Sequence, residues 1–218
     1  PLPDGGSLLV DLGNGRLTIL DADLNFVETM PIASGDPRPG GDSPLVLALP
    51  RGVDAEGNIY AQAMSMGMGG AMPDSGAVLR INRRTQTVDT AATFKLEDRN
   101  RTESGDANNR SVQISPVPLS AQDAWGIAPD GSVVIARVGD YHIDWVSADG
   151  SIRSGAPQRF DAVRIRTGEK EEFVTAQGRS GGGVGVGVEI NNGAMQMTFQ
   201  RGGRGGGPRE IDSYDWPD

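Results

Sequence analysis

The chain has 218 residues, with 20 Lys and Arg against 29 Asp and Glu, a formal net charge of −9, one His and no Cys. The absence of Cys excludes disulfides, thiolate metal centres and cysteine nucleophiles, and the single His excludes mechanisms that need two histidines in one chain. The negative charge argues against nucleic acid or an anionic membrane as the main partner, and no apolar run approaches the ~18 residues that span a bilayer.

Glycine and proline, 32 and 14 residues, make up about a fifth of the chain, against roughly 12% in average usage. Because hydrophobic residues are only 37% of the total, this composition favours many short strands joined by tight turns. We therefore expect an all-β fold. The chain starts at Pro1 rather than Met and ends without a closing strand, so we interpret both ends as cut.

Strand-like segments separated by turn residues begin near the N-terminus, at 6–12, 16–20 and 25–30. Asn14-Gly15, between the first two segments, predicts a hairpin turn because both residues tolerate positive φ. An apolar–acidic turn–Gly–apolar pattern then recurs at 53–60 and at 127–134.

Three second hairpins follow these turns at intervals of about 60 residues. Aligned by pattern, they begin with Leu17-Thr18-Ile19, Leu79-Arg80-Ile81 and Ile143-Asp144-Trp145. Three units of four short strands are typical of β-propeller blades.

The segments 52–60, 125–133 and 141–150 carry a resemblance to six-bladed β-propellers of the NHL and TolB-like kind, over about residues 5–166. The resemblance implies a partial propeller, since three units cannot close a six-bladed ring. It also implies a bacterial protein that is secreted or periplasmic, although no signal peptide is visible in this chain.

We expect residues 1–166 to form three four-stranded antiparallel blades, at about 5–47, 48–118 and 119–166. The polar segments 34–44, 64–76 and 97–110 are expected to be surface loops. A short helix is predicted at 167–177, with Thr167 as its N-cap. A Gly-rich segment, 178–218, follows and contains a hairpin pattern at 184–200.

His142 and Asp144 lie on one face of a predicted strand, because side chains alternate along a strand. They could form a proton-transfer pair. The competing interpretation is a structural histidine, since no Ser motif or second acid is spaced to join the pair.

The sequence offers candidates for three kinds of metal site. Propeller hydrolases and lactonases hold a central metal with carboxylates from several blades, and Asp54, Asp123 and Asp140 are the candidates for such a calcium site. The segment 21–25, Asp-Ala-Asp-Leu-Asn, has calcium-like spacing but reads more simply as a turn. Met64, Met66 and Met68 offer soft ligands for Cu(I), or belong to a flexible loop.

The segment 201–207, with two arginines among glycines, is similar to RNA-binding Arg-Gly-Gly runs, but it lacks interleaved aromatic residues and is expected to be a linker. No cofactor is predicted, and neither nucleic acid nor a membrane span is expected.

Three functions remain open. The first is a non-enzymatic binding or scaffold module that engages a protein, a glycan or a small molecule through its blade loops. The second is a metal-dependent hydrolase or lactonase. The third is one half of a split or oligomeric propeller, whose outer blades are covered by the missing half or by another chain.

Overall fold

The computed structural model describes residues 1–11, 14–34, 45–66, 73–105, 109–161, 163–180, 184–191, 194–201, 211–214 and 216–217. These residues divide into two compact units. The first comprises 1–96 and 122–159, and the second comprises 97–121 and 160–218.

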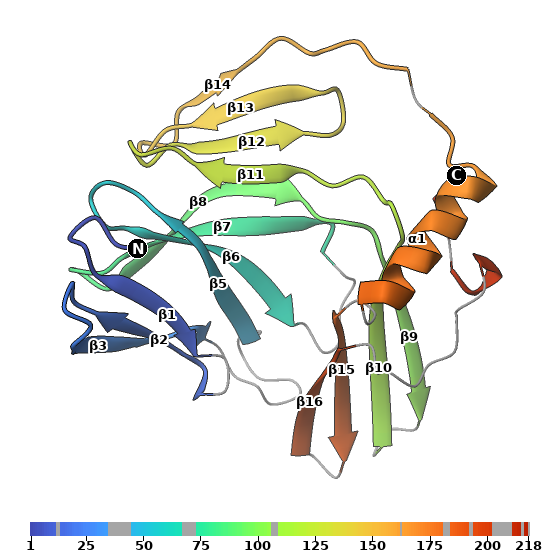
Figure 1. Ribbon diagram of the computed structural model, residues 1–218, viewed down its shortest axis with the longest axis horizontal. Helices are drawn as coiled ribbons and strands as arrows, with labels where there is room; N and C mark the ends of the chain where they lie inside the picture. The colour runs from blue at the N-terminus through green and yellow to red at the C-terminus, as the bar shows by residue number, and fades with distance from the viewer. Residues whose placement is uncertain are drawn as a thin grey trace. The chain divides into compact units, whose positions relative to one another are not determined.

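The first unit consists of three antiparallel sheets. The first sheet holds β1 (Ser7–Asp11), β2 (Arg16–Leu20) and β3 (Phe26–Pro31). The middle sheet holds β4 (Ala33–Ser34), β5 (Leu45–Val53), β6 (Ile59–Met66), β7 (Ser75–Asn82) and β8 (Thr87–Lys95). The third sheet holds β11 (Ala124–Ile127), β12 (Val133–Arg137), β13 (His142–Val146) and β14 (Ile152–Ser154). The all-β prediction is confirmed, with three, five and four strands per sheet in place of a uniform four (Figure 1).

Two apolar cores join the three sheets, and the middle sheet contributes one face to each. Leu17 and Ile19 of the first sheet pack with Ile59 and Ile81 of the middle sheet. On the other face of β6, Tyr60 packs with residues of the third sheet, including Val133, Ile135 and Val146. Because side chains alternate along β6, this one strand contributes residues to both cores. The three sheets lie side by side in chain order (Figure 1).

The first hairpin differs from the Asn-Gly turn predicted for it. Asp11 pairs with Arg16, so four residues connect β1 and β2 rather than two. The Asp11 carboxylate accepts hydrogen bonds from the Asn14 backbone N–H (3.2 Å) and from its side-chain Nδ2 (2.7 Å). Asn14 therefore serves here as a side-chain donor to the strand end.

The comparison of the three repeats by sequence pattern is wrong by one residue in the middle unit. Ile59 pairs with Ile81, and Val133 pairs with Val146. By these pairings Val78, not Leu79, is equivalent to Ile143. A shift of one residue moves every side chain to the opposite face, and alternation of apolar residues on both faces of β7 hides such a shift in the sequence.

The second unit holds a four-stranded antiparallel sheet in the order β16-β15-β10-β9. Its strands are β9 (Arg99–Gly105), β10 (Asn109–Pro116), β15 (Val184–Asn191) and β16 (Ala194–Arg201). The hairpin pattern at 184–200 corresponds to β15 and β16. The expected loop at 97–110 is wrong for the strand residues of β9 and for the start of β10. Those residues are mostly polar, and the apolar periodicity that marks a strand is missing.

The helix α1 (Thr167–Ser180) begins where predicted and ends three residues later than expected. Its N-cap is Arg166 rather than Thr167. The Arg166 carbonyl accepts from the Glu169 N–H, and the Glu169 carboxylate accepts from the Arg166 N–H, as the glutamate of a capping box does. Phe173 of α1 packs edge-on against Tyr214 and Trp216, beside the 3₁₀ turn η2 (Ile211–Ser213). None of the helices among the described residues has the length and apolar character to cross a bilayer.

Candidate functional site

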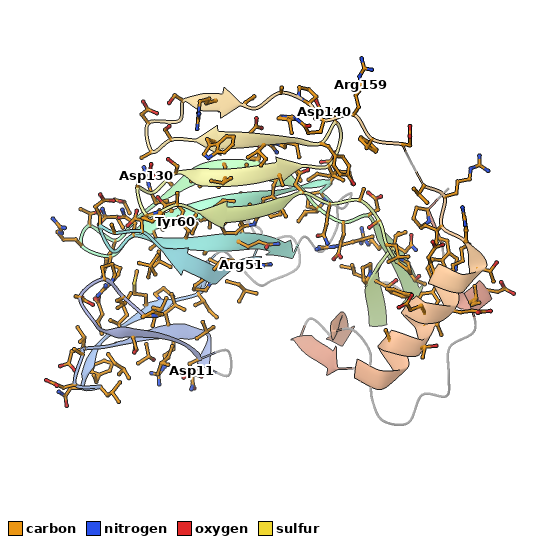
Figure 2. All side chains as sticks on the ribbon, turned by 45° about the horizontal axis from the view of Figure 1, so that its top comes forward. Asp11, Arg51, Tyr60, Asp130, Asp140 and Arg159 are labelled. Carbon is orange, nitrogen blue, oxygen red and sulfur yellow. The ribbon has the colours of Figure 1, made fainter. Side chains whose placement is uncertain are left out.

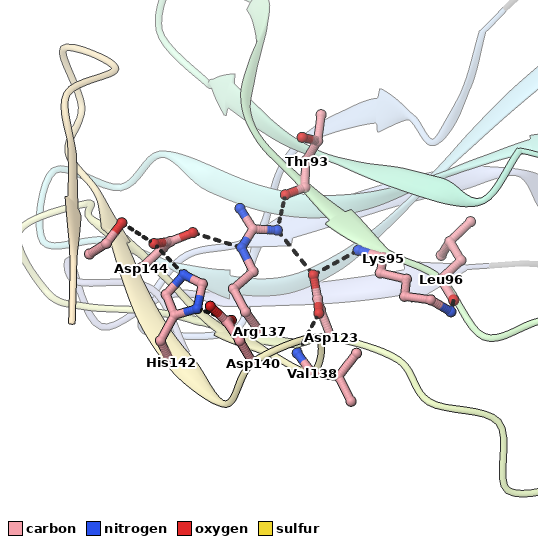
Figure 3. Close-up of polar contacts among 10 residues, drawn as sticks. Thr93, Lys95, Leu96, Asp123, Arg137, Val138, Asp140, His142 and Asp144 are labelled. Atoms are coloured by element: carbon pink, nitrogen blue, oxygen red, sulfur yellow. Dashed lines mark hydrogen bonds and ion pairs between the residues drawn. The ribbon is translucent and has the colours of Figure 1, made fainter. Parts of the chain in front are cut away.

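The most connected polar group of the first unit surrounds Arg137, at the end of β12 (Figure 3). We call its six side chains the Arg137 cluster: Asp123, Arg137, Asp140, His142, Asp144 and Ser154. Alternation along β12 places Arg137 on the same face as Val133 and Ile135, which is the face that packs on the middle sheet.

Arg137 joins the third sheet to the middle sheet. Its Nε donates to Asp144 Oδ2 at 2.7 Å, and its Nη1 donates to Asp123 Oδ2 at 3.0 Å. Nη1 also donates to the backbone carbonyl of Thr93 in β8, at 3.0 Å. Burial opposes the charge of the guanidinium, but the two carboxylates outweigh that effect and raise the pKa of Arg137.

Asp123 is a buried carboxylate that accepts three hydrogen bonds from two segments of the chain. Its oxygens accept from the Lys95 N–H (2.8 Å) and the Val138 N–H (2.9 Å), in addition to Arg137. The Asp123 N–H donates in turn to the Lys95 carbonyl at 3.0 Å. Burial alone would raise the pKa of Asp123, yet these hydrogen bonds lower it below the ordinary value. Asp123 therefore continues the hydrogen bonding between β8 and the segment before β11.

His142 lies between two carboxylates. Its Nδ1 contacts Asp140, and its Nε2 lies 3.1 Å from Asp144 Oδ1. The bond to Asp140, and to a lesser degree the charge of Asp144, raise the pKa of His142 against a smaller opposing effect of burial. Asp144 Oδ1 also accepts from the Ser154 hydroxyl at 2.6 Å. Despite its burial, Asp144 has a lowered pKa because of Ser154, Arg137 and His142.

This geometry favours the imidazolium form of His142, since both ring nitrogens face acceptors and only the protonated ring can donate from both. A general base needs a neutral ring with a free nitrogen directed at substrate. The charged side chains of the Arg137 cluster are therefore held by hydrogen bonds to one another and to other protein groups.

A second polar group joins the same two sheets at the opposite end of β12. Asp54 accepts from the Asn58 N–H and from Asn58 Nδ2, both at 2.8 Å. The Tyr60 hydroxyl lies 2.9 Å from the Gly131 carbonyl oxygen and 3.2 Å from Asp54 Oδ2. Burial, followed by the charge of Asp54, raises the pKa of Tyr60 to about 12. Asp54 thus accepts hydrogen bonds within a turn and from the buried Tyr60 hydroxyl.

The structure brings only some of the candidate residues together. His142, Asp144, Asp123 and Asp140 belong to the Arg137 cluster, whereas Asp54 lies beside Gly131 at the other end of β12. Figure 2 shows this separation, with Asp130, next to Gly131, and Asp140 labelled at opposite ends of the third sheet. Within the described part of the chain, no three His, Cys, Asp or Glu side chains are grouped so that they could hold a metal ion.

The remaining candidates are turn or strand residues. Asp21 accepts from the backbone N–H groups of Asp23 (3.0 Å) and Asn25 (2.8 Å), as a turn residue does, and these bonds lower its pKa. Met64 and Met66 are residues of β6. Met68 lies outside the described residues, and so does most of the run 201–207.

Sequence reasoning missed Arg137 and Ser154. A signal for Arg137 was present, because the alternation of Val133 and Ile135 puts a charged residue next on a buried face, where it needs a partner. No local pattern marks Ser154, which reaches Asp144 from a neighbouring strand.

No protein-family model and no curated protein matches the chain. The chain is similar to a protein of known crystal structure from Lactobacillus plantarum, at 12% sequence identity and a TM-score of 0.23. The similarity covers 66% of this chain and 51% of that protein, so the chain spans about half the length of its structural neighbour. This likeness carries no functional information, and function rests on the residues described above.

Proposed function

We propose that the chain is a non-enzymatic binding or scaffold module, and that the three sheets of its first unit are blades of a β-propeller. Two features support the propeller assignment. The three sheets are antiparallel and pack through two apolar cores in chain order, as neighbouring blades do. The turn before β1, β6 and β12 recurs with a glycine at positive φ, at Gly5, Gly57 and Gly131.

The closed hydrogen bonding of the Arg137 cluster is the observation that carries the non-enzymatic assignment. The only histidine of the chain has both ring nitrogens on carboxylates, and Asp144 and Asp123 are bonded to Arg137. Catalysis by His142 would require breaking its bonds to Asp140 and Asp144, and catalysis by Asp123 would require breaking hydrogen bonds that join the third sheet to the middle sheet. Their role is therefore to stabilise the contact between sheets, and recognition is left to the loops.

The partners that fit this proposal are a protein, a glycan or a small molecule bound at the blade loops, together with another chain or further blades against the outer sheets. The acidic charge of −9 excludes polyanionic surfaces as preferred partners. A secreted or periplasmic bacterial location follows from the family resemblance.

Calcium titration combined with a hydrolysis assay tests the proposal against a metal-dependent hydrolase. We expect the same melting temperature in millimolar calcium and in EDTA, and no saturable hydrolysis of a panel of lactones and aryl esters. A calcium-dependent rise in melting temperature, with saturable hydrolysis that is lost in Asp140→Asn but kept in Asp149→Asn, would overturn it. Asp149 is the matched control, since it is an exposed turn carboxylate bonded to Ser151.

A further inference from the structure

In the three sheets of the first unit, the strands pair in the same way when residues are counted from the turn glycine. The residues of the three sheets can therefore be compared position by position. The turn glycines Gly5, Gly57 and Gly131 have φ of +85°, +85° and +80°. Two residues after each glycine comes the first paired residue of the strand that follows it, which is β1, β6 or β12. These first pairs are Ser7 with Leu20, Ile59 with Ile81, and Val133 with Val146.

Each sheet has a forward face, defined as the face that contacts, or would contact, the following sheet in chain order. Leu17 on the forward face of the first sheet is 1% exposed, and its equivalent Val78 in the middle sheet is 0% exposed. Each is covered by the next sheet. Ile143 is the equivalent residue of the third sheet and is 40% exposed.

The forward face of the third sheet is apolar around Ile143. Val134 and Trp145 form a cross-strand pair there, at the positions that Leu8 with Ile19 and Tyr60 with Arg80 occupy in the other sheets. The guanidinium carbon of Arg153 lies 4.7 Å from the Trp145 ring centroid. This face has the composition of a sheet contact, and nothing among the described residues covers Ile143 as Leu17 and Val78 are covered.

The opposite, backward face of the first sheet is the complementary case. Leu9 pairs with Thr18 there, at the position of Ala61 in the middle sheet and Ile135 in the third sheet. Ala61 and Ile135 are both 0% exposed because a preceding sheet covers them, whereas Leu9 is 49% exposed. Phe26, which pairs with Leu20 on the same face, is also exposed.

We propose that the forward face of the third sheet in one copy of the chain binds the backward face of the first sheet in a second copy. The chain itself carries both halves of a contact that it already makes twice, between the first and middle sheets and between the middle and third sheets. Ile143 and Trp145 would then meet Leu9 and Leu20, an aliphatic and aromatic contact at the same register positions. A second copy of the chain is the occupant that carries the matching face.

This contact joins two different surfaces, so it is heterologous. A copy whose forward face is damaged still offers an intact backward face, and the converse holds for damage to the backward face. Two singly damaged copies can therefore restore one good contact when they are mixed. A contact between two identical faces could not do so.

Sedimentation velocity on the full chain tests the proposal, with Ile143→Lys and Leu9→Asp as the two face variants. We expect the unmodified chain to self-associate and each variant alone to dissociate, with the dissociation constant raised about tenfold or more, because a charge in the contact lacks a partner. The equimolar mixture of the two variants should recover association. Ile152→Lys is the matched control, since Ile152 is 60% exposed on the opposite face of the same sheet.

Circular dichroism melts check that each variant is folded before its association is measured. A chain that stays monomeric up to high micromolar concentration overturns the proposal, and so does equal disruption by Ile152→Lys. Association that survives Leu9→Asp but not Ile143→Lys overturns it as well, since the face would then meet its own copy.

This inference rests on the part of the proposed function that treats the sheets as propeller blades. It does not depend on a ligand at the loops or on the absence of catalysis. A monomeric chain without calcium-dependent hydrolysis would remove the inference alone, whereas a self-associating hydrolase would remove the proposed non-enzymatic function alone.

Discussion

His142 is the residue whose environment is most informative, because two carboxylates hold its two ring nitrogens. Folding raises its pKa above the ordinary value of 6.5. The stabilisation that it contributes is therefore complete below about pH 6.5 and is lost as the pH rises through the folded-state pKa. Asp144 acts in the opposite sense, since its lowered pKa gives stability that is lost on acidification.

A proton NMR titration can measure the His142 pKa without assignment, because the chain has one histidine. We expect a pKa above 6.5 in the folded protein. Asp140→Asn should move it downward, since the Asp140 bond is the largest cause of the shift. Asp149→Asn, at a turn carboxylate bonded to Ser151, is the control and should leave the titration unchanged. An unchanged pKa in Asp140→Asn would show that the contact does not persist in solution.

Arg137 is expected to contribute more to stability than an exposed arginine. Arg137→Met leaves the buried Asp123 without its cation and Asp144 with His142 alone, and breaking such a buried pair costs ~3 kcal/mol of unfolding free energy. Arg16→Met removes an exposed pair with Asp11 and should cost less than about 1 kcal/mol. Urea unfolding of the two variants gives the comparison, and equal losses would contradict a structural role for the cluster.

At the scale of elements, the turn before β12 depends on Gly131. Its φ is +80°, and a Cβ added there would lie 2.9 Å from the Tyr60 hydroxyl oxygen and 3.1 Å from Asp54 Oδ2. The glycine therefore allows both the turn and the hydrogen bonds that join the middle and third sheets at this end.

Gly131→Ala should cost more stability than Gly150→Ala. Both glycines have positive φ, but nothing lies within 4 Å of a Cβ placed at Gly150. Both variants carry the left-handed strain of about 1–2 kcal/mol. Only Gly131→Ala also displaces the Tyr60 hydroxyl, which adds ~1 kcal/mol for the disturbed hydrogen bonds. Thermal melts of both variants measure the difference, and similar melting temperatures would contradict the contact at Gly131.

The elements that the sequence predicted well are those with local signals. Apolar alternation and turn residues located β1 to β3 and the hairpins of the middle and third sheets, and the acidic first turn located α1. No strand was predicted for β4 or β5, and the expected loop 64–76 is wrong for the end of β6 and the start of β7. The strand β9 and the start of β10 were missed because they lack apolar alternation, and their sheet is completed by strands that are remote in the chain. The polar strand β9 pairs with β10, and β10 pairs in turn with β15, about 80 residues later.

The candidate site followed the same division. His142 and Asp144 share a face, as strand periodicity required. Their partner Arg137 comes from the neighbouring strand, and Asp123 comes from before β11. The separation of Asp54 from Asp123 and Asp140 could not be predicted, because it depends on which end of β12 each turn contacts.

At the scale of the whole molecule, the two units are built by different means. In the first unit, each sheet is stabilised by apolar contact with a neighbour, and Arg137 and Asp123 add hydrogen bonds between the third and middle sheets. In the second unit, strands far apart in the chain share one sheet. Stability of the first unit is therefore expected to behave as a sum over neighbouring sheets, as in repeat proteins.

The common register of the three sheets has a consequence for how such a chain can lengthen. A stretch of gene that runs from one turn glycine to the next encodes three strands of one sheet and then the outer strands of the next sheet, as β1 to β3 and then β4 and β5 lie between Gly5 and Gly57. Tandem duplication of that stretch adds a sheet that already fits its neighbours. Insertion of a single codon within a central strand, by contrast, turns the apolar residues beyond it to the wrong side. Such a chain therefore tolerates the duplication of whole modules better than small insertions within its strands.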